Sequence, residues 1–279
     1  MKDRKKFIVA IDQGTTSSRA ILFNTSGVPI FKSQLEFKQY FPNNGWVEHN
    51  PEEIWKTTKK VLLKAINRSK KLKGRILTIG ITNQRETVVM WDKTTGEPVY
   101  NAIVWQCRRT KEYCDNLNRS YKDTVYEKTG LYIDSYFSAS KIKWIFDNIK
   151  TAQKLSNQGN LLVGTIDTWI IWNLTGRKNH VTEHTNACRT MLFNINSKTW
   201  DKDLLKLFNV SQSILPEVKN SMDNFGSAII GACSIPIEGV AGDQQALQMP
   251  KNVAKDTLNR RMEERSSWMN WEKCLWLLR

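Results

Sequence analysis

The sequence has few of the residues that form disulfide frameworks or bind transition metals. Its 279 residues include five cysteines, with no Cys-x-x-Cys pair, and three histidines, His49, His180 and His184. Because the cysteines are scattered and odd in number, we expect reduced thiols and a cytoplasmic protein. The same scarcity argues against a transition-metal cluster.

Long apolar runs are also absent. No stretch approaches the roughly 18 apolar residues that indicate a membrane span. The charged start, residues 1–6, leads directly into a strand-like run rather than into the apolar region of a signal peptide. The Gly-x-x-x-x-Gly-Lys and Gly-x-Gly-x-x-Gly loops that bind nucleotides in many proteins do not occur either.

Acidic residues are outnumbered, with 27 Asp and Glu against 42 Lys and Arg, which gives a net charge of +15. Such an excess can indicate a nucleic-acid surface. The basic residues are spread along the chain, however, and the densest clusters, 2–6 and 70–75, are short. We therefore expect no nucleic-acid partner, and a basic solvated surface or an anionic small substrate instead.

What the chain does contain is an alternation of strand-like and helix-like segments. Asn50 followed by Pro51 and two glutamates predicts a helix start, and residues 141–155 carry apolar side chains at helical spacing. The predicted strands are residues 6–12, 19–24, 28–37, 75–81, 87–91, 161–166 and 235–241. The pattern indicates an α/β domain with a mixed sheet, in which the first two strands form a hairpin.

The bend of this first hairpin has an unusual composition. Asp12 ends the first strand, and Gly14 and four hydroxyl residues follow before Arg19 opens the second: Thr15, Thr16, Ser17 and Ser18. A glycine allows backbone N–H groups to approach a ligand, and the hydroxyls and the arginine suit a polyphosphate. Asp12 cannot bind phosphate, but it can hold Mg²⁺ through the water shell of the ion. A plain hydrophilic turn is the alternative.

Two further strand ends carry polar groups. Arg85 and Glu86 follow one strand, where a donor and an acceptor side by side can bind neighbouring hydroxyls of a polyol; the alternative is a surface ion pair of little energetic value. Asp243 follows Gly242 after the last clear strand. It can take a proton from a hydroxyl or serve only as a helix cap.

Several longer runs carry a family resemblance: residues 11–19, 45–49, 80–87, 101–109, 185–187, 189–193 and 242–245. They resemble the FGGY carbohydrate kinase family, which has the actin-like ATPase (ribonuclease H-like) fold, and in particular its glycerol kinases. The resemblance extends from about Lys6 to about Leu247. It implies ATP-dependent phosphorylation of glycerol to glycerol 3-phosphate, with Mg²⁺, and leaves a homo-oligomer open.

The resemblance also implies roles for individual residues. Thr15, Thr16, Ser17 and Arg19 would bind the nucleotide phosphates, and Asp12 would lie near Mg²⁺. Asp243 would be the catalytic base. The residues that would bind glycerol are Arg85, Glu86, Tyr136, Asp243, Gln244, Trp105 and Thr15, with the indole of Trp105 as an apolar wall.

The end of the chain departs from the family pattern. No glycine follows Gly242, whereas the family continues into a second domain with another glycine-rich phosphate turn and the adenosine pocket. We therefore expect an N-terminal domain over residues 1–247, an atypical tail over 248–279, and no activity from this chain alone. A non-catalytic fragment and another FGGY polyol or sugar kinase are the alternatives.

Overall fold

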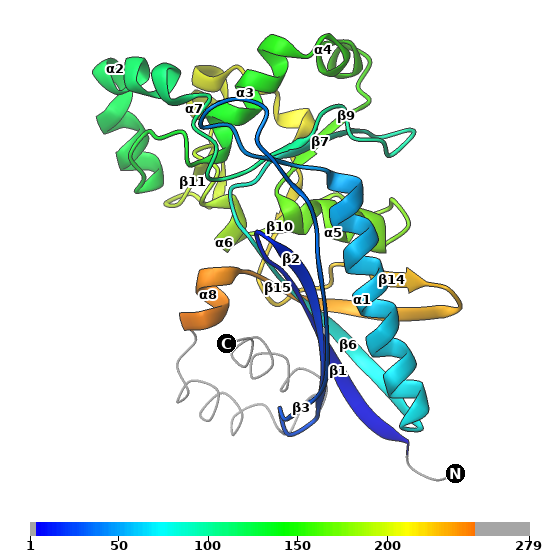
Figure 1. Ribbon diagram of the computed structural model, residues 1–279. Helices are drawn as coiled ribbons and strands as arrows, with labels where there is room; N and C mark the ends of the chain where they lie inside the picture. The colour runs from blue at the N-terminus through cyan, green and yellow to red at the C-terminus, as the bar shows by residue number, and fades with distance from the viewer. Residues whose placement is uncertain (1–3, 249–279) are drawn as a thin grey trace.

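A computed structural model describes residues 4–248 of the chain (Figure 1). Its helices and strands are, in chain order, β1 (Lys5–Gln13), β2 (Ser17–Asn24), β3 (Pro29–Glu36), β4 (Gln39–Tyr40), β5 (Glu48–His49), α1 (Pro51–Lys71), β6 (Gly74–Asn83), β7 (Val89–Asp92), β8 (Ala102–Ile103), α2 (Lys111–Thr129), α3 (Ser138–Asn148), α4 (Lys150–Asn157), β9 (Leu161–Gly164), α5 (Ile166–Leu174), β10 (Val181–Glu183), α6 (His184–Ala187), β11 (Phe193–Asn194), β12 (Thr199–Trp200), α7 (Lys202–Phe208), a 3₁₀ turn (Gln212–Ile214), β13 (Glu217–Lys219), β14 (Ser227–Ile230), β15 (Cys233–Gly242) and α8 (Asp243–Gln248). The tail predicted for residues 248–279 lies outside the described residues, apart from Gln248.

A six-stranded mixed sheet forms the centre of the fold, in the order β14-β15-β6-β1-β2-β3. Strands β15, β6 and β1 run parallel, whereas β2, β3 and β14 are antiparallel to their neighbours. The predicted hairpin is confirmed, and its register sets Asp12 opposite Arg19. The sheet therefore brings together, side by side, the ends of three parallel strands that are far apart in the sequence.

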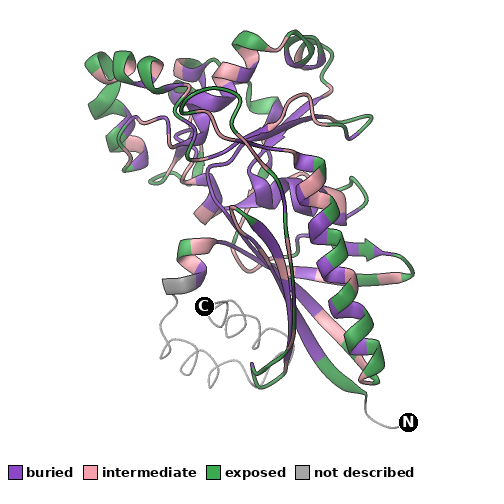
Figure 2. Ribbon diagram, viewed as in Figure 1, coloured by how far each residue is buried: buried purple, intermediate pink, exposed green. Residues whose placement is uncertain are grey.

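Helix α1 covers one face of the sheet, and its start is built as the sequence predicts. The Asn50 side chain accepts hydrogen bonds from the backbone N–H groups of Glu52 and Glu53, and Pro51 is the first helical residue. The buried residues of α1 recur at helical spacing and include Ile54, Val61, Leu62, Ala65 and Ile66. Figure 2 shows this division, with the buried stripe toward the sheet and exposed residues outside.

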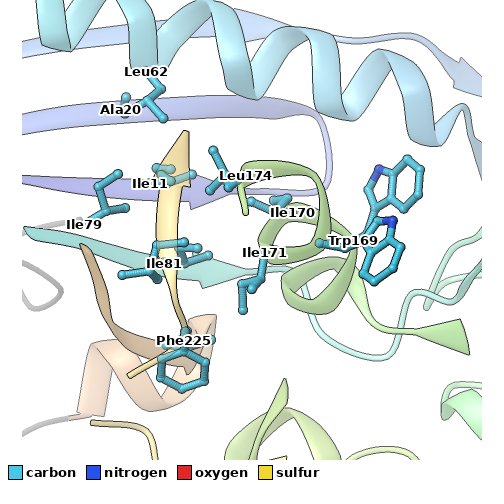
Figure 3. Close-up of a cluster of buried hydrophobic side chains, with 14 of the residues drawn as sticks. Ile11, Ala20, Leu62, Ile79, Ile81, Trp169, Ile170, Ile171, Leu174 and Phe225 are labelled. Carbon is cyan, nitrogen blue, oxygen red and sulfur yellow. The ribbon is translucent and has the colours of Figure 1, made fainter. Parts of the chain in front are cut away.

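Helix α5 packs against α1, β6 and β14 and adds its apolar side chains to the main core. Figure 3 shows Ile170, Ile171 and Leu174 of α5 beside sheet residues such as Ile11 and Ile81. At the start of α5, the indole N–H of Trp169 donates to the carbonyl oxygen of Pro51 at 2.9 Å, which ties α5 to the first turn of α1. Nearly every residue of α5 is buried, and its acidic residue Asp167 accepts hydrogen bonds from Thr165 and Thr182.

A second apolar cluster lies among α2, α3, α4, α7 and the short strands β7 and β9, at the top of Figure 1. Here one sequence prediction is wrong, because residues 141–155 do not form one helix. Ile149 is extended (φ −114°, ψ 99°), and it ends α3 and precedes α4. The side-chain amide of Gln153 donates to the carbonyl of Phe146 and satisfies part of the exposed end of α3. The break lets Ile145 and Leu155 face the same cluster.

Within the described part of the chain, no helix combines the length and the apolar composition that crossing a membrane requires.

Candidate active site

The candidate site lies where β1, β6 and β15 end. In the sheet register, Gln13 of β1 is paired with Asn83 of β6, and Asn83 with Gly242 of β15. The segments that follow, residues 14–16, 84–86 and 243–245, therefore emerge at one edge of the sheet. The carboxyl edge of parallel strands is the usual place for a ligand in α/β proteins.

The bend after β1 differs in part from the sequence interpretation. The N–H of Gly14 donates to the carbonyl oxygen of Ser17 at 2.9 Å, so this donor closes the bend and is not directed at a ligand. Ser18 is buried, and its hydroxyl bonds to the hydroxyl of Thr57 in α1 at 2.9 Å. The hydroxyl of Ser17 accepts from the side chain of Gln34 at 3.0 Å. The prediction that all four hydroxyls face a ligand is therefore wrong for Ser18.

Thr15 and Thr16 remain the accessible hydroxyls of the bend. Thr16 is exposed, and Thr15 is partly buried because its Oγ1 accepts a hydrogen bond from the indole N–H of Trp105 at 3.1 Å. Asp12 and Arg19 form an ion pair across the hairpin, with 3.2 Å between Oδ2 and Nη1. The bend thus presents two hydroxyls beside a paired acid and base.

Asp12 is partly buried and lies near both a positive and a negative side chain. Burial raises the pKa of Asp12 above its ordinary value, Arg19 opposes this shift, and the negative charge of Asp243 adds to it. Asp12 and Asp243 are therefore close enough to interact. Yet among residues 4–248 no group of three or more His, Cys, Asp or Glu side chains is arranged to hold a metal ion.

One or two carboxylates are enough for Mg²⁺ only where waters and phosphates supply the other ligands, so Asp12 and Asp243 are the residues here that could contribute to such a site.

Arg85 organises the third segment. It is 3% exposed, and its two Nη atoms donate to Gln245 Oε1 at 2.9 Å and to Gln244 Oε1 at 2.6 Å. Its Nε lies 3.3 Å from Oδ1 of Asp243. Gly242 makes this crossing feasible, since a Cβ on it would come within 2.2 Å of Cδ of Arg85. One guanidinium therefore fixes the polar side chains at the start of α8.

Glu86 has a left-handed backbone conformation (φ 61°), which is uncommon for a non-glycine residue. Its Oε1 accepts a hydrogen bond from Nε of Arg189 at 2.6 Å and lies 3.9 Å from Nε of Arg85. Burial raises the pKa of Glu86, and the two arginines oppose that shift. Glu86 is thus a buried hydrogen-bond acceptor held between two cations.

Aromatic side chains lie next to these polar groups. The rings of Trp105 and Tyr136 have centroids 5.3 Å apart, and the guanidinium of Arg189 lies 5.6 Å from the ring of Tyr136. The geometry therefore gathers two chains of contacts, one from Thr15 through Trp105 to Tyr136 and one from Glu86 through Arg85 to Asp243 and Gln244. These chains contain most of the residues that the sequence singled out.

Three residues of the site were not identified from the sequence. Arg189 contacts both Glu86 and the aromatic ring of Phe137, and Gln245 is a partner of Arg85. Lys141 is fully buried, and its Nζ donates to the carbonyl oxygens of residues 135, 136 and 137 at 2.6, 2.6 and 2.9 Å. Arg189 and Gln245 lie in the runs that resemble the family, which was the available signal; a lone lysine in a helix gives none.

Comparison with known proteins shows close relatives. Residues 7–249 match the family model for the N-terminal domain of the FGGY family of carbohydrate kinases. The glycerol kinase of Francisella tularensis subsp. holarctica is 54% identical to this chain over 263 residues, which cover 91% of this chain and 52% of that protein. The chain therefore spans about half the length of the curated relatives it matches.

Solved structures agree. The crystal structure of Plasmodium falciparum glycerol kinase with ADP matches with a TM-score of 0.85 and 37% sequence identity, over 88% of this chain and 50% of that one. The gluconate kinase of Lactobacillus acidophilus matches with a TM-score of 0.77 over 87% of this chain and 49% of that one; at 23% identity it shows the fold alone. The predicted fold class, an actin-like ATPase domain with a mixed sheet flanked by helices, is confirmed.

Proposed function

Because this chain belongs to the FGGY family of carbohydrate kinases, we propose that it supplies the glycerol- and phosphate-binding half of a cytoplasmic kinase that converts glycerol and ATP to glycerol 3-phosphate and ADP. The observation that carries the proposal is the contact set of Arg85. This buried guanidinium holds Asp243, Gln244 and Gln245 beside Glu86, so that hydrogen-bonding side chains from two segments lie together.

Glycerol recognition follows from the chemistry of this set. Ionised Glu86 accepts hydrogen bonds from hydroxyl groups, whereas the amide of Gln244 and the phenol of Tyr136 can donate or accept. Trp105 presents an apolar ring to the carbon chain and is held in place by its hydrogen bond to Thr15. A pentose or hexose has more hydroxyls and carbons than these groups can satisfy, so we expect it to bind more weakly.

Proton transfer is assigned to Asp243. The hydroxyl oxygen of glycerol attacks the γ-phosphorus of ATP, the bond from that phosphorus to the β-bridging oxygen breaks, and the hydroxyl proton passes to the carboxylate of Asp243. The side chain of Asp243 is 47% exposed at the mouth of the site, where an acceptor can reach it.

Phosphate binding is assigned to the bend after β1. Thr15 and Thr16 offer hydroxyl donors, Ser17 lies beside them, and Arg19 carries a positive charge next to Asp12. Asp12 would hold Mg²⁺ through water, and Mg²⁺, when bound, neutralises charge on the phosphate oxygens. In this arrangement the protein positions the phosphates and the acceptor, which is the main requirement of phosphoryl transfer.

The experiment uses two proteins: the 279-residue chain and a fused protein in which residues 1–247 precede the C-terminal half of the Francisella tularensis glycerol kinase. Formation of glycerol 3-phosphate from ATP is measured for both. We expect turnover by the fused protein and little or none by the chain alone, which covers about half of its relatives. A fused protein that prefers xylulose or gluconate to glycerol would contradict the assigned substrate.

The variant Asp243→Asn in the fused protein tests whether Asp243 accepts the hydroxyl proton of glycerol. We expect its kcat to fall by roughly 10²- to 10⁴-fold. Asp223→Asn is the matched control, because Asp223 also accepts a hydrogen bond from the next backbone N–H but lies away from Arg85. Equal kcat values for the two variants would refute the role of Asp243. Sedimentation of the fused protein tests whether it forms a homo-oligomer, which the family resemblance leaves open.

A further inference from the structure

The segment β10–α6 carries a buried carboxylate to which the proposed mechanism gives no role. Glu183 is 0% exposed, and no ion pair among residues 4–248 includes it. Its oxygens accept five hydrogen bonds: from Thr185 N at 2.7 Å, Thr185 Oγ1 at 2.6 Å, Asn186 N at 2.8 Å, Asn186 Nδ2 at 2.9 Å and Ser221 Oγ at 2.8 Å. Neutral donors thus satisfy this carboxylate, and no cation in the described part of the chain is paired with it.

The hydrogen bonds of Thr185 have a fixed direction. An ionised carboxylate only accepts, so the hydroxyl of Thr185 must donate its proton to Glu183. The backbone N–H of Gly242 only donates, and it lies 2.8 Å from the same hydroxyl oxygen. Thr185 therefore links Glu183 to Gly242 in one orientation only, and a bond to a charged group is stronger than one between neutral groups.

Gly242 is the residue immediately before Asp243. Its other surroundings are equally constrained, because the side chain of Arg85 crosses the place where a Cβ would be. Ser221, which donates to Glu183, also accepts through its carbonyl oxygen from the N–H of Val240 at 2.9 Å. Glu183 is therefore linked to the end of β15 twice: through Thr185 to Gly242, and through Ser221 to Val240.

We propose that Glu183 and Thr185 are positioning residues that fix the backbone before Asp243, so that its carboxylate meets the hydroxyl of the acceptor in reactive geometry. This inference rests on the proposed function. Neither residue is assigned a contact with the substrate: Thr185 acts through Gly242, and Glu183 acts through Thr185. Thr185 opens one of the sequence runs that resemble the family, and its bond to Gly242 gives a physical reason for a hydroxyl residue at this position.

The consequence should appear in the chemical step. A misplacement of about 1 Å at a reacting group can lower the rate on the order of 10²-fold. Glycerol is held mainly by Arg85, Glu86 and Gln244, which do not contact Thr185. Loss of the Thr185 hydroxyl should therefore lower kcat by about 10- to 100-fold and change KM for glycerol by less than about 3-fold.

Three variants of the fused protein test the proposal. Thr185→Val removes both hydrogen bonds at nearly constant volume, and Thr185→Ser keeps the hydroxyl. Thr190→Val is the matched control, since its hydroxyl also donates one hydrogen bond and accepts one, to Ala187 O and from Leu192 N, within the same segment. We expect a loss of kcat in Thr185→Val, near wild-type kcat in Thr185→Ser, and less than a 3-fold change in Thr190→Val.

Hydrogen exchange of the Gly242 amide in the 279-residue chain gives a readout that is independent of catalysis. We expect exchange at least 10-fold faster in Thr185→Val than in Thr185→Ser or Thr190→Val. Equal exchange in all three, equal kcat for the two valine variants, or an effect confined to KM would each overturn the positioning role. If the wild-type fused protein does not phosphorylate glycerol, the proposed function is refuted instead. The amide exchange then still tests whether the Thr185 hydroxyl holds the Gly242 N–H.

Discussion

Replacing Arg189 by methionine tests whether this arginine stabilises the carboxylate of Glu86. Arg189 donates from Nε to Oε1 of Glu86 at 2.6 Å, whereas Arg85 is 3.9 Å from the same oxygen. The Glu86 side chain is 2% exposed, so without Arg189 a buried carboxylate retains only its more distant cation. Burial already raises the pKa of Glu86, and the loss of Arg189 removes the nearer opposing charge.

The size of the effect follows from these contacts. A hydrogen bond to a charged group contributes about 1.5–3 kcal/mol. Since Arg189 is itself 24% exposed and Arg85 remains, we expect a loss of about 2 kcal/mol. For a chain of this size that lowers Tm by about 4–8 °C. Thermal unfolding of the 279-residue chain measures this loss.

The same variant should change the pH dependence of glycerol binding. Glu86 accepts hydroxyl protons only as a carboxylate, and a raised pKa means that it protonates earlier as the pH falls. In the fused protein, KM for glycerol should therefore begin to rise at a higher pH in Arg189→Met than in the wild type. Initial rates at several glycerol concentrations between about pH 5 and 8 measure the shift.

Arg108→Met is the control for Arg189→Met. Arg108 pairs with Asp134 at 3.2 Å, but the two side chains are 56% and 48% exposed, so this pair contributes at most about 1 kcal/mol. The reasoning is refuted if the two variants lower Tm equally and leave the pH dependence of KM unchanged.

Three further predictions concern buried groups. Burial lowers the pKa of both His49 and His180 from 6.5 to about 4, so their contribution to stability is complete above about pH 6.5 and lost as the pH falls toward 4. His49→Gln and His180→Gln should flatten the pH dependence of Tm in that interval, and an unchanged slope would contradict this. Gly242→Ala should displace Arg85 and raise KM for glycerol by roughly 10-fold; an unaltered KM would show that Arg85 can move without loss. Lys141→Met removes three donors to carbonyl groups around Tyr136, and we expect a similar rise in KM in glycerol assays, which would be absent if Lys141 only supports the fold.

The sequence predicts every strand of the central sheet except the edge strand β14, because the relevant signals are local. The apolar runs of β1 and β2 are separated by a polar bend, and α1 begins with an asparagine cap and a proline. The break at Ile149 has no such signal. Ile145 and Leu155 continue the helical spacing across it, and only the packing of both onto one tertiary cluster requires an extended residue between them.

The site could be predicted only in part, for a related reason. Side-chain chemistry and family resemblance indicate which residues can bind phosphate or a polyol, but direction depends on tertiary contacts. Ser17 and Ser18 are the first two residues of β2, and because successive strand residues face opposite sides, Ser18 turns toward Thr57 of α1 while Ser17 bonds to Gln34. Residue type alone cannot show which face of the sheet a hydroxyl points toward.

The closest ion pairs of this site do not join the charged residues that are adjacent in the sequence. Arg85 and Glu86 are adjacent in sequence, yet their closest oxygen-to-nitrogen separation is 3.9 Å, and each has a nearer partner from another segment: Asp243 for Arg85 and Arg189 for Glu86. The pair is therefore not a self-contained surface salt bridge. Because each charge is paired with a group from another segment of the chain, moving one segment changes the ionic environment of the others. A ligand with several hydroxyls that bridges these segments would gain from their fixed separation. Thr185 and Lys141 bond to the backbone beside these segments, at Gly242 and at residues 135–137, and under the proposed function such bonds hold that separation.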